Sequence, residues 1–326
     1  MKKLSVCLLT VILALSILTA CNPDVGAQNN GQDKIKIVTT IFPEYDWVMN
    51  ILGDKAEDAE VVLLTEKGVD LHSFQPTFAD MMNISKADVF IYVGGESDGW
   101  AEDVLKNAEN KNLQTVSLME VLGDSAKEEE IIEGMEGEEE EEAEESETEY
   151  DEHVWLSVKN ASLFVNAIEK ALESADPLNA EAYRNNADAY LKELEELDNE
   201  FETSVSSSNK KVLLFADRFP FRYLTDDYNL DYYAAFVGCS TETQASFNTI
   251  MFLSDKADEN NLSSVIIIEG SDGKIAEAVN NNSNNKDRKI LTMDSMQSVS
   301  MEDIKDGVTY ISIMKNNLEV LKEALN

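Results

Sequence analysis

The sequence predicts an α/β fold in which two parallel-sheet lobes are joined by one long α-helix. Short β-branched runs alternate with amphipathic segments from residue 35 onward, and the alternation resumes in the last third of the chain. Between these regions lies an unbroken helical pattern. Strands that alternate with helices are typical of βαβ units, which build parallel sheets. We therefore expect an N-terminal lobe over residues 34–177, a linking helix over residues 178–206 and a C-terminal lobe over residues 207–326.

The N-terminal lobe should contain four strands with helices between them. Its strands are expected at residues 35–41, 60–64, 88–93 and 115–118, and its helices near residues 44–52, 77–85 and 100–108. Apolar residues from Ala161 to Leu172 mark a further amphipathic helix that ends near Pro177. The linking helix carries apolar residues at helical spacing from Tyr183 to Phe201. Its length is about seven turns, or roughly 40 Å, long enough to run along both lobes.

The C-terminal lobe repeats the pattern and ends with a helix over residues 308–325. Its strands are expected at residues 211–215, 232–236, 265–268 and 289–292. A polar or small residue closely follows each strand, and these residues are Asp217, Gly238, Glu269 and Asp294. In open α/β sheets, ligands bind beyond the carboxyl ends of the strands. Two such sheets that face each other would bring these residues to one inter-lobe cleft.

Charge excludes some partners and favours others. The 326 residues include 64 Asp and Glu but only 26 Lys and Arg, which gives a formal net charge of -38. A surface this acidic repels phosphate backbones, so we expect no nucleic-acid partner, and cations are the natural ligands. Residues 128–152 alone contain sixteen Asp and Glu and no Lys or Arg. The acidic loop over residues 124–152 is either a solvated charged linker or a weak collector of cations for a nearby site.

The first 33 residues read as a leader and a tether. Residues 1–20 combine Lys2 and Lys3 with an apolar run, which is typical of a signal peptide and too short for a stable transmembrane helix. The ending Leu18–Cys21 resembles a bacterial lipobox, which implies cleavage before Cys21 and a diacylglyceryl anchor on its sulfur. An ordinary secreted protein cut nearby is the alternative. Residues 21–33 would then form a lipid-anchored, flexible tether on the outer face of the bacterial cytoplasmic membrane.

The chain contains only two histidines, and carboxylates flank both of them. His72 lies just before a helix start that Thr77 and Asp80 are expected to cap, and His153 follows the acidic run. Neutral imidazole is the commonest side-chain ligand of zinc and similar ions. The two residues therefore indicate a metal site, although ordinary surface or core histidines are the simpler alternative.

The surroundings of both histidines resemble known metal motifs. The segments Gly68–Thr77 and Asp151–Ala161 resemble the two metal motifs of the zinc and manganese substrate-binding lipoproteins of ABC importers. The likeness covers residues 35–326, including the long helix and the ending Met293-Asp294-Ser295. It implies a metal site in the inter-lobe cleft, with His72 and His153 supplied by the N-terminal lobe and the Asp294 carboxylate by the C-terminal lobe.

One ligand position departs from the family pattern. The third ligand of the family lies three residues before an aromatic, and here that register falls on Ala216 or Arg218, neither of which can bind a cation. We take Asp217 as the substitute, with a salt bridge to a neighbouring arginine as its alternative role. Glu242 is the second choice. Cys239 is a further option, although a lone cysteine is more typical as a small buried residue. With cysteines only at positions 7, 21 and 239, we expect no intramolecular disulfide in the mature protein.

The predicted function is that of a monomeric extracytoplasmic carrier that captures a divalent metal ion and delivers it to the permease of an ABC importer. Two imidazole nitrogens and two carboxylate oxygens suit tetrahedral Zn²⁺, and Mn²⁺ is the alternative metal. An enzyme is not expected, because the chain has neither a His-Glu-x-x-His pattern nor a Gly-x-Ser-x-Gly elbow. A cell-surface adhesin that uses the acidic loop remains an alternative. So does a binder of organic ligands that uses Tyr232, Tyr233, Arg218 and Arg222.

Overall fold

The computed structural model describes residues 34–136, 149–240 and 244–326. The predicted signal peptide, the tether and the lipidation site Cys21 lie outside these residues, as do Glu242 and residues 137–148 of the acidic loop. Everything below concerns the compact unit Ile35–Asn326. Within the described residues, no helix combines the length and the apolar character needed to cross a membrane.

The N-terminal lobe is built on a four-stranded, all-parallel sheet with the strand order β2-β1-β3-β4. Its strands are β1 (Ile35–Thr39), β2 (Ala59–Leu63), β3 (Val89–Tyr92) and β4 (Gln114–Ser117). Its helices are α2 (Phe42–Leu52), η1 (Gly53–Asp58), η2 (Leu71–Ser73), α3 (Phe78–Ser85), α4 (Trp100–Lys106), α5 (Leu118–Leu122), η3 (Gly123–Ser125), η4 (Val154–Leu156) and α6 (Val158–Ala175). As predicted, Thr77 and Asp80 form a capping box at the start of α3.

The C-terminal lobe repeats this topology with the strand order β6-β5-β7-β8, again all parallel. Its strands are β5 (Val212–Phe219), β6 (Asp231–Val237), β7 (Ser264–Ile268) and β8 (Lys289–Met293). Its helices are α8 (Arg222–Asp227), α9 (Phe247–Glu259), α10 (Lys274–Asn282), α11 (Met301–Lys305) and α12 (Tyr310–Ala324). In each lobe the strand order reverses beside the first strand of the sheet, and such a switch point is where open sheets bind ligands.

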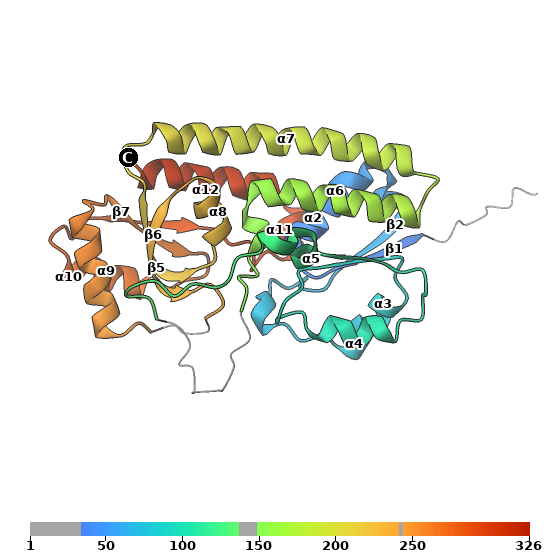
Figure 1. The fold of residues 1–326 in the computed structure, drawn as a ribbon, viewed down its shortest axis with the longest axis horizontal. Helices are drawn as coiled ribbons and strands as arrows, with labels where there is room; N and C mark the ends of the chain where they lie inside the picture. Colours follow the sequence, from blue (N-terminus) through green and yellow to red (C-terminus); the bar gives the residue numbers. More distant parts are fainter. Residues whose placement is uncertain (1–33, 137–148, 241–243) are drawn as a thin grey trace, which may run out of the picture. The chain divides into compact units, whose positions relative to one another are not determined.

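The long helix α7 (Ala180–Ser207) packs against both lobes (Figure 1). It contacts α2 and α6 of the N-terminal lobe and α12 of the C-terminal lobe. Its buried residues recur at helical spacing and include Leu194, Leu197 and Phe201, so one apolar stripe serves both lobes. The predicted fold class, two parallel-sheet α/β lobes with a long connecting helix, is confirmed.

Buried contacts hold the two lobes against each other. Trp155, from η4, donates its indole N–H to the carbonyl oxygen of Ser295 in the C-terminal lobe at 2.9 Å. The Tyr310 hydroxyl donates in return to the carbonyl oxygen of Trp155 at 2.8 Å. The Tyr310 ring also packs edge-on against Trp47, with their centroids 5.3 Å apart. Because these groups are buried, separating the lobes would expose aromatic surface and break satisfied hydrogen bonds.

Candidate metal site

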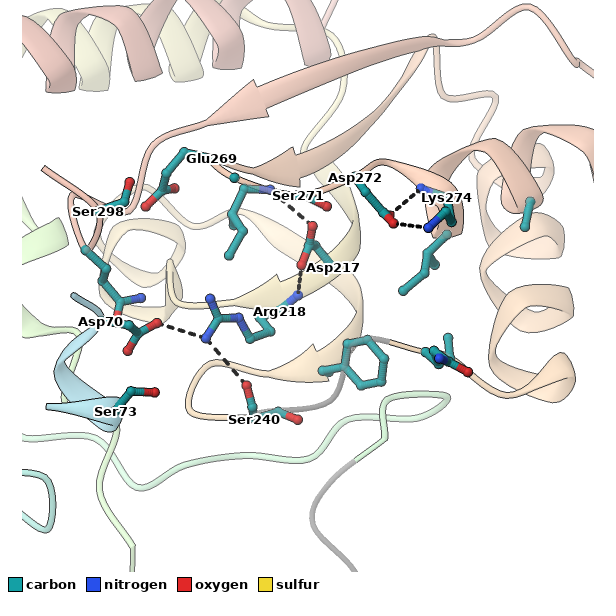
Figure 2. A pocket seen from close by; sticks show the side chains of 18 of the residues that line it. Asp70, Ser73, Asp217, Arg218, Ser240, Glu269, Ser271, Asp272, Lys274 and Ser298 are labelled. Atoms are coloured by element: carbon teal, nitrogen blue, oxygen red, sulfur yellow. Dashed lines mark hydrogen bonds and ion pairs between the residues drawn. The ribbon is translucent and has the colours of Figure 1, made fainter. Parts of the chain in front are cut away.

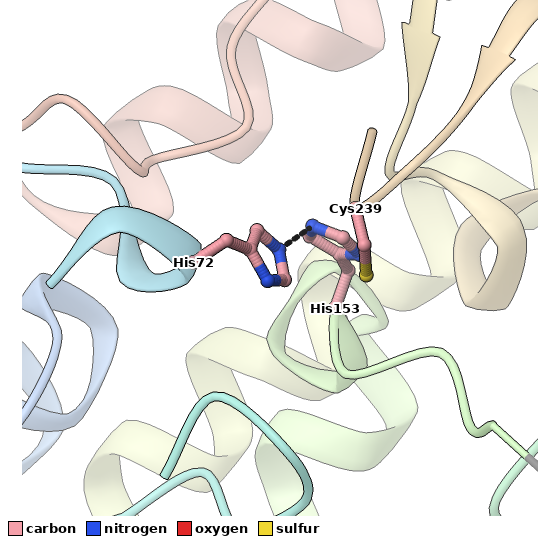
Figure 3. Close-up of side chains that lie close together, drawn as sticks. All are labelled: His72, His153 and Cys239. Atoms are coloured by element: carbon pink, nitrogen blue, oxygen red, sulfur yellow. Dashed lines mark hydrogen bonds between the residues drawn. The ribbon is translucent and has the colours of Figure 1, made fainter. Parts of the chain in front are cut away.

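The two histidines, 81 positions apart in sequence, meet at one point between the lobes (Figure 3). His72 lies in η2 and His153 directly precedes η4. Their Nε2 atoms are 3.1 Å apart, and His153 is completely buried. Two nitrogens on one tetrahedral zinc ion lie roughly 3.3 Å apart, as follows from Zn–N bonds of about 2.0–2.1 Å. The observed spacing is therefore close to that of two imidazoles sharing one ion.

A carboxylate orients the His153 ring. The Oδ1 atom of Asp151 accepts the His153 main-chain N–H at 2.8 Å and lies 3.0 Å from the ring nitrogen Nδ1. A ring that donates its Nδ1 proton to this carboxylate keeps a lone pair on Nε2, where a cation can bind. Asp151 is itself buried, so the orientation does not depend on a mobile surface group.

His72 has an equivalent support on its own Nδ1. The Ser97 hydroxyl oxygen lies 2.8 Å from His72 Nδ1, and Oε2 of Glu152 lies 3.6 Å from it. Glu152 accepts the Ser97 main-chain N–H through Oε1 at 2.9 Å. Gly95, at φ 90°, makes room for this carboxylate, because a Cβ there would contact Glu152 Oε1. Both imidazoles thus point Nε2 at the same space.

Burial keeps the His72 ring neutral. Loss of solvation and the proximity of His153 lower the pKa of His72 from 6.5 to about 4. The ring is therefore unprotonated at neutral pH and ready to bind a cation.

Cys239 completes a set of three potential ligands. Within the described residues, a donor atom from each of His72, His153 and Cys239 lies within 4.8 Å of the other two. Cys239 follows β6 in a turn that approaches His153 closely. A Cβ at Gly238 would lie only 2.9 Å from Cε1 of His153, so the approach requires glycine. Burial, together with Glu129, raises the pKa of the Cys239 thiol, so the thiol holds its proton until a metal displaces it.

The two carboxylates predicted as ligands make other contacts in this structure. Oδ1 of Asp294 accepts the Met296 main-chain N–H at 2.7 Å. Asp217 lies where the β5 register shifts, and its oxygens accept the main-chain N–H groups of Arg218 at 2.9 Å and Ile268 at 3.4 Å. Within the described residues, neither carboxylate belongs to the three-residue cluster. Their assignment as ligands stays a prediction.

Arg218 ties together the two loops that carry the cluster. Its Nη1 donates to Oδ2 of Asp70 at 3.0 Å and to the carbonyl oxygen of Ser240 at 3.5 Å (Figure 2). Asp70 in turn accepts the His72 main-chain N–H at 3.0 Å through Oδ1. Arg218 thus joins the His72 loop of one lobe to the Cys239 turn of the other.

The described ends of the acidic loop are attached to the C-terminal lobe. Lys127 pairs with Asp226 at 2.6 Å, and Glu130 pairs with Arg222 at 2.7 Å. The main chain of Glu136 pairs with β6, and Met135 is buried in the core. Arg222 pairs with Glu130 and Arg218 with Asp70, and among the described residues neither arginine forms a salt bridge with Asp217.

The sequence is similar to those of known zinc-binding and zinc-uptake proteins. The family model described as "Zinc-uptake complex component A periplasmic" matches residues 37–324. The zinc-binding lipoprotein AdcA of Streptococcus pneumoniae R6 is 29% identical over 99% of this chain, which spans 61% of AdcA's length. The high-affinity zinc uptake system protein ZnuA of Bacillus subtilis is 30% identical, with 97% of each chain covered.

Solved structures agree with the sequence relatives. The Zn(II)-bound ZnuA-like domain of Streptococcus pneumoniae AdcA has a TM-score of 0.70 and 27% identity, with 90% of this chain and 99% of that chain covered. The metal-dependent lipoprotein YcdH of Bacillus subtilis has a TM-score of 0.73 and 27% identity, with 90% and 100% covered. The laminin-binding protein Lmb of Streptococcus agalactiae, an adhesin with metal-transporting activity, has a TM-score of 0.71 and covers 90% and 100%. At 23% identity, the likeness to Lmb shows the fold alone.

Proposed function

Because the chain belongs to the family of zinc-uptake component A proteins, we propose that it captures Zn²⁺ outside the cytoplasm and delivers it to the permease of an ABC importer. The observation that carries the proposal is the 3.1 Å approach of the two Nε2 atoms, supplied by the only histidines in the chain. The family is one of transport components rather than of enzymes. The choice of zinc as the metal rests on the relatives, since those named above include zinc-binding and zinc-uptake proteins.

The donor set favours zinc over manganese. Two imidazoles and one thiolate are ligands that zinc prefers, whereas manganese prefers oxygen donors. We propose His72, His153 and Cys239 as protein ligands. Asp294 and Asp217 are the alternative donors from the C-terminal lobe, although neither belongs to the cluster of three. Binding would release the Cys239 thiol proton to solvent, so zinc affinity should fall as the pH is lowered.

The proposed delivery of zinc to a membrane permease depends on the predicted lipid anchor at the end of the signal peptide. We propose that a lipid on Cys21 anchors the protein at the outer face of the cytoplasmic membrane, where a monomer could present its ion to the permease. The lipobox resemblance at Leu18–Cys21 supports this step. The fold-level likeness to an adhesin supplies no residue that would support adhesion as a second function.

Zinc titration of single variants tests the ligand assignment. Metal-free protein would be titrated with zinc against a chromophoric chelator, in parallel with elemental analysis of the protein as purified. We expect His72→Ala, His153→Ala and Cys239→Ser each to weaken zinc binding by orders of magnitude. Asp294→Asn and Asp217→Asn are the comparison variants, because each keeps an oxygen that can accept the present hydrogen bonds. Unchanged zinc affinity in His153→Ala would refute the proposed function.

A further inference from the structure

Helix α8 of the C-terminal lobe holds the segment that carries His153. The hydroxyl group of Tyr223, in the first turn of α8, donates to the main-chain carbonyl oxygen of Asp151 at 2.9 Å. At the other end of α8, Oδ2 of Asp227 accepts the hydroxyl of Ser157 at 2.5 Å. His153 lies between Asp151 and Ser157 in the sequence, so one element of the C-terminal lobe holds this segment on both sides of the histidine.

The Tyr223 hydroxyl makes two hydrogen bonds at once. It also accepts the main-chain N–H of Lys127 at 3.0 Å, and the Lys127 carbonyl oxygen accepts the main-chain N–H of Asp151 at 2.8 Å. The hydroxyl thus joins the two described ends of the acidic loop. Tyr223 and Asp151 are each only 2% exposed, so water cannot readily replace the hydroxyl if it is removed.

Asp151 connects this hydrogen-bond network to the His153 ring. Its Oδ1 atom accepts the His153 main-chain N–H at 2.8 Å and lies 3.0 Å from the ring nitrogen Nδ1. The position of this carboxylate depends on the Asp151 main chain, which Tyr223 holds through the carbonyl oxygen. Outer hydrogen bonds of this kind orient metal-binding histidines and fix their tautomer.

The other histidine is linked to the C-terminal lobe in a similar way. Oδ1 of Asp70 accepts the His72 main-chain N–H at 3.0 Å, and Oδ2 of the same carboxylate accepts from Arg218 at 3.0 Å. Each histidine thus follows an aspartate by two positions, and each aspartate contacts the C-terminal lobe. Tyr223 is the more direct of the two links to test, because replacing an uncharged hydroxyl leaves the charges around the ion unchanged.

We propose that Tyr223 is a positioning residue for zinc binding. It holds the Asp151 main chain, and the Asp151 carboxylate in turn holds the His153 ring with Nε2 directed at His72. This inference rests on the proposed function for the identity of the ion. The C-terminal lobe thus acts on the zinc site through α8 as well as through a ligand, so a movement of α8 away from Asp151 would weaken the hold on the His153 ring.

Zinc titration of Tyr223→Phe against a chromophoric chelator is the first test. The substitution removes the hydroxyl and keeps the ring. Because Tyr223 acts one step further from the ion than Asp151, we expect zinc affinity to fall by about three- to tenfold, less than for a direct partner of the histidine. Tyr183→Phe is the matched control, since Tyr183 is buried and its hydroxyl donates to Asp176 at 2.7 Å, outside this network. It should bind zinc as tightly as the wild type.

The tautomer of His153 in the zinc-free protein gives a second readout that a purely structural role would not change. The chain has only two histidines, so ¹⁵N-histidine labelling yields a simple NMR spectrum, and His72→Ala assigns the His153 signals. In the wild type and in Tyr183→Phe, the proton of the His153 ring should reside on Nδ1. In Tyr223→Phe, the Nε2–H tautomer should become populated.

A double-mutant cycle with Asp151→Ala shows whether Tyr223 acts through Asp151. In the Asp151→Ala background His153 has already lost its acceptor, so Tyr223→Phe should cost little further zinc affinity. Losses of affinity that add in full, or a loss without a change of tautomer, would overturn the inference.

Two other outcomes separate this inference from the proposed function. Wild-type zinc affinity together with an unchanged tautomer in Tyr223→Phe would overturn the inference and leave the proposed function intact. A wild type that binds no zinc would overturn the proposed function, and the tautomer of His153 in the zinc-free proteins would still show whether Tyr223 positions the ring.

Discussion

Replacing Asp151 with alanine should weaken zinc binding although Asp151 is not one of the proposed ligands. The substitution removes one carboxylate oxygen that supports His153 twice, at 2.8 Å from its main-chain nitrogen and 3.0 Å from Nδ1. His153 is fully buried, so water cannot readily replace the lost acceptor. The ring would lose both its preferred tautomer and its fixed orientation.

The expected loss can be estimated from the role of this contact. Removing a partner that orients a metal-bound histidine typically lowers metal affinity about 10- to 100-fold, or roughly 1.4–2.7 kcal/mol. Asp151→Ala should reach the upper half of this range, because it removes both hydrogen bonds. Asp151→Asn can place its amide oxygen where Oδ1 now lies, so it loses the charge but retains the geometry. The zinc affinity of Asp151→Asn should therefore fall by tenfold or less.

Zinc competition titrations of the two variants separate orientation from charge. Circular dichroism and thermal melting of the zinc-free proteins report whether the fold is retained. Asp255→Ala, on the exposed face of α9, is the control for removing an acidic residue far from the cluster. If Asp151→Ala folds and binds zinc as tightly as the wild type, Asp151 does not orient His153 for metal binding, and the assignment of Nε2 as the ligand atom loses its support.

Two further predictions concern close packing and pH. Gly238→Ala should lower zinc affinity by about tenfold or more, since its Cβ would press on the His153 ring; unchanged affinity in the same titration would show that the turn can move away. Burial and the nearby Asp98 raise the pKa of Glu44 from 4.5 to about 8, so the folded state binds more protons than the unfolded state between these values. The unfolding free energy contributed by this group is fully present below pH 4.5 and is lost as the pH rises toward 8, at up to about 1.4 kcal/mol per pH unit. Glu44→Gln should flatten this decline in urea unfolding measured across the range, and parallel declines in variant and wild type would contradict the pKa shift.

Local sequence pattern predicted the eight strands and the long helix, whereas helices such as α9 and α10 were not predicted individually. The apolar face of α7 repeats at helical spacing because the helix must bury one stripe against both lobes. The β-branched runs are continuous because helices cover both faces of a parallel sheet. The predicted linking helix over residues 178–206 corresponds to the observed helix Ala180–Ser207. The meeting of the two histidines followed from the family resemblance rather than from any periodicity.

The position of Cys239 could not be derived in the same way. Burial is the usual fate of a free cysteine, and its proximity to His72 and His153 depends on how the turn after β6 packs against the other lobe. One signal did exist. Gly238 was among the residues expected at the ends of the strands, and the adjacent cysteine lies at the same edge of the sheet. Asp217 was predicted as a ligand, but its oxygens accept main-chain N–H groups at the point where the register of β5 shifts. The sequence pattern gave no sign of this register shift.

Arg218 is one of the two residues, with Ala216, on which the register of the family's third ligand falls. A carboxylate or imidazole at this position would supply a donor to the ion, whereas the guanidinium supplies positive charge and a hydrogen bond to Asp70. In a cavity lined by several acids, that cation reduces the attraction for a divalent ion. If the register of the family's third ligand falls at Arg218, the C-terminal lobe must supply its donors from other residues, and Cys239, Asp294 and Asp217 are the ones that we propose.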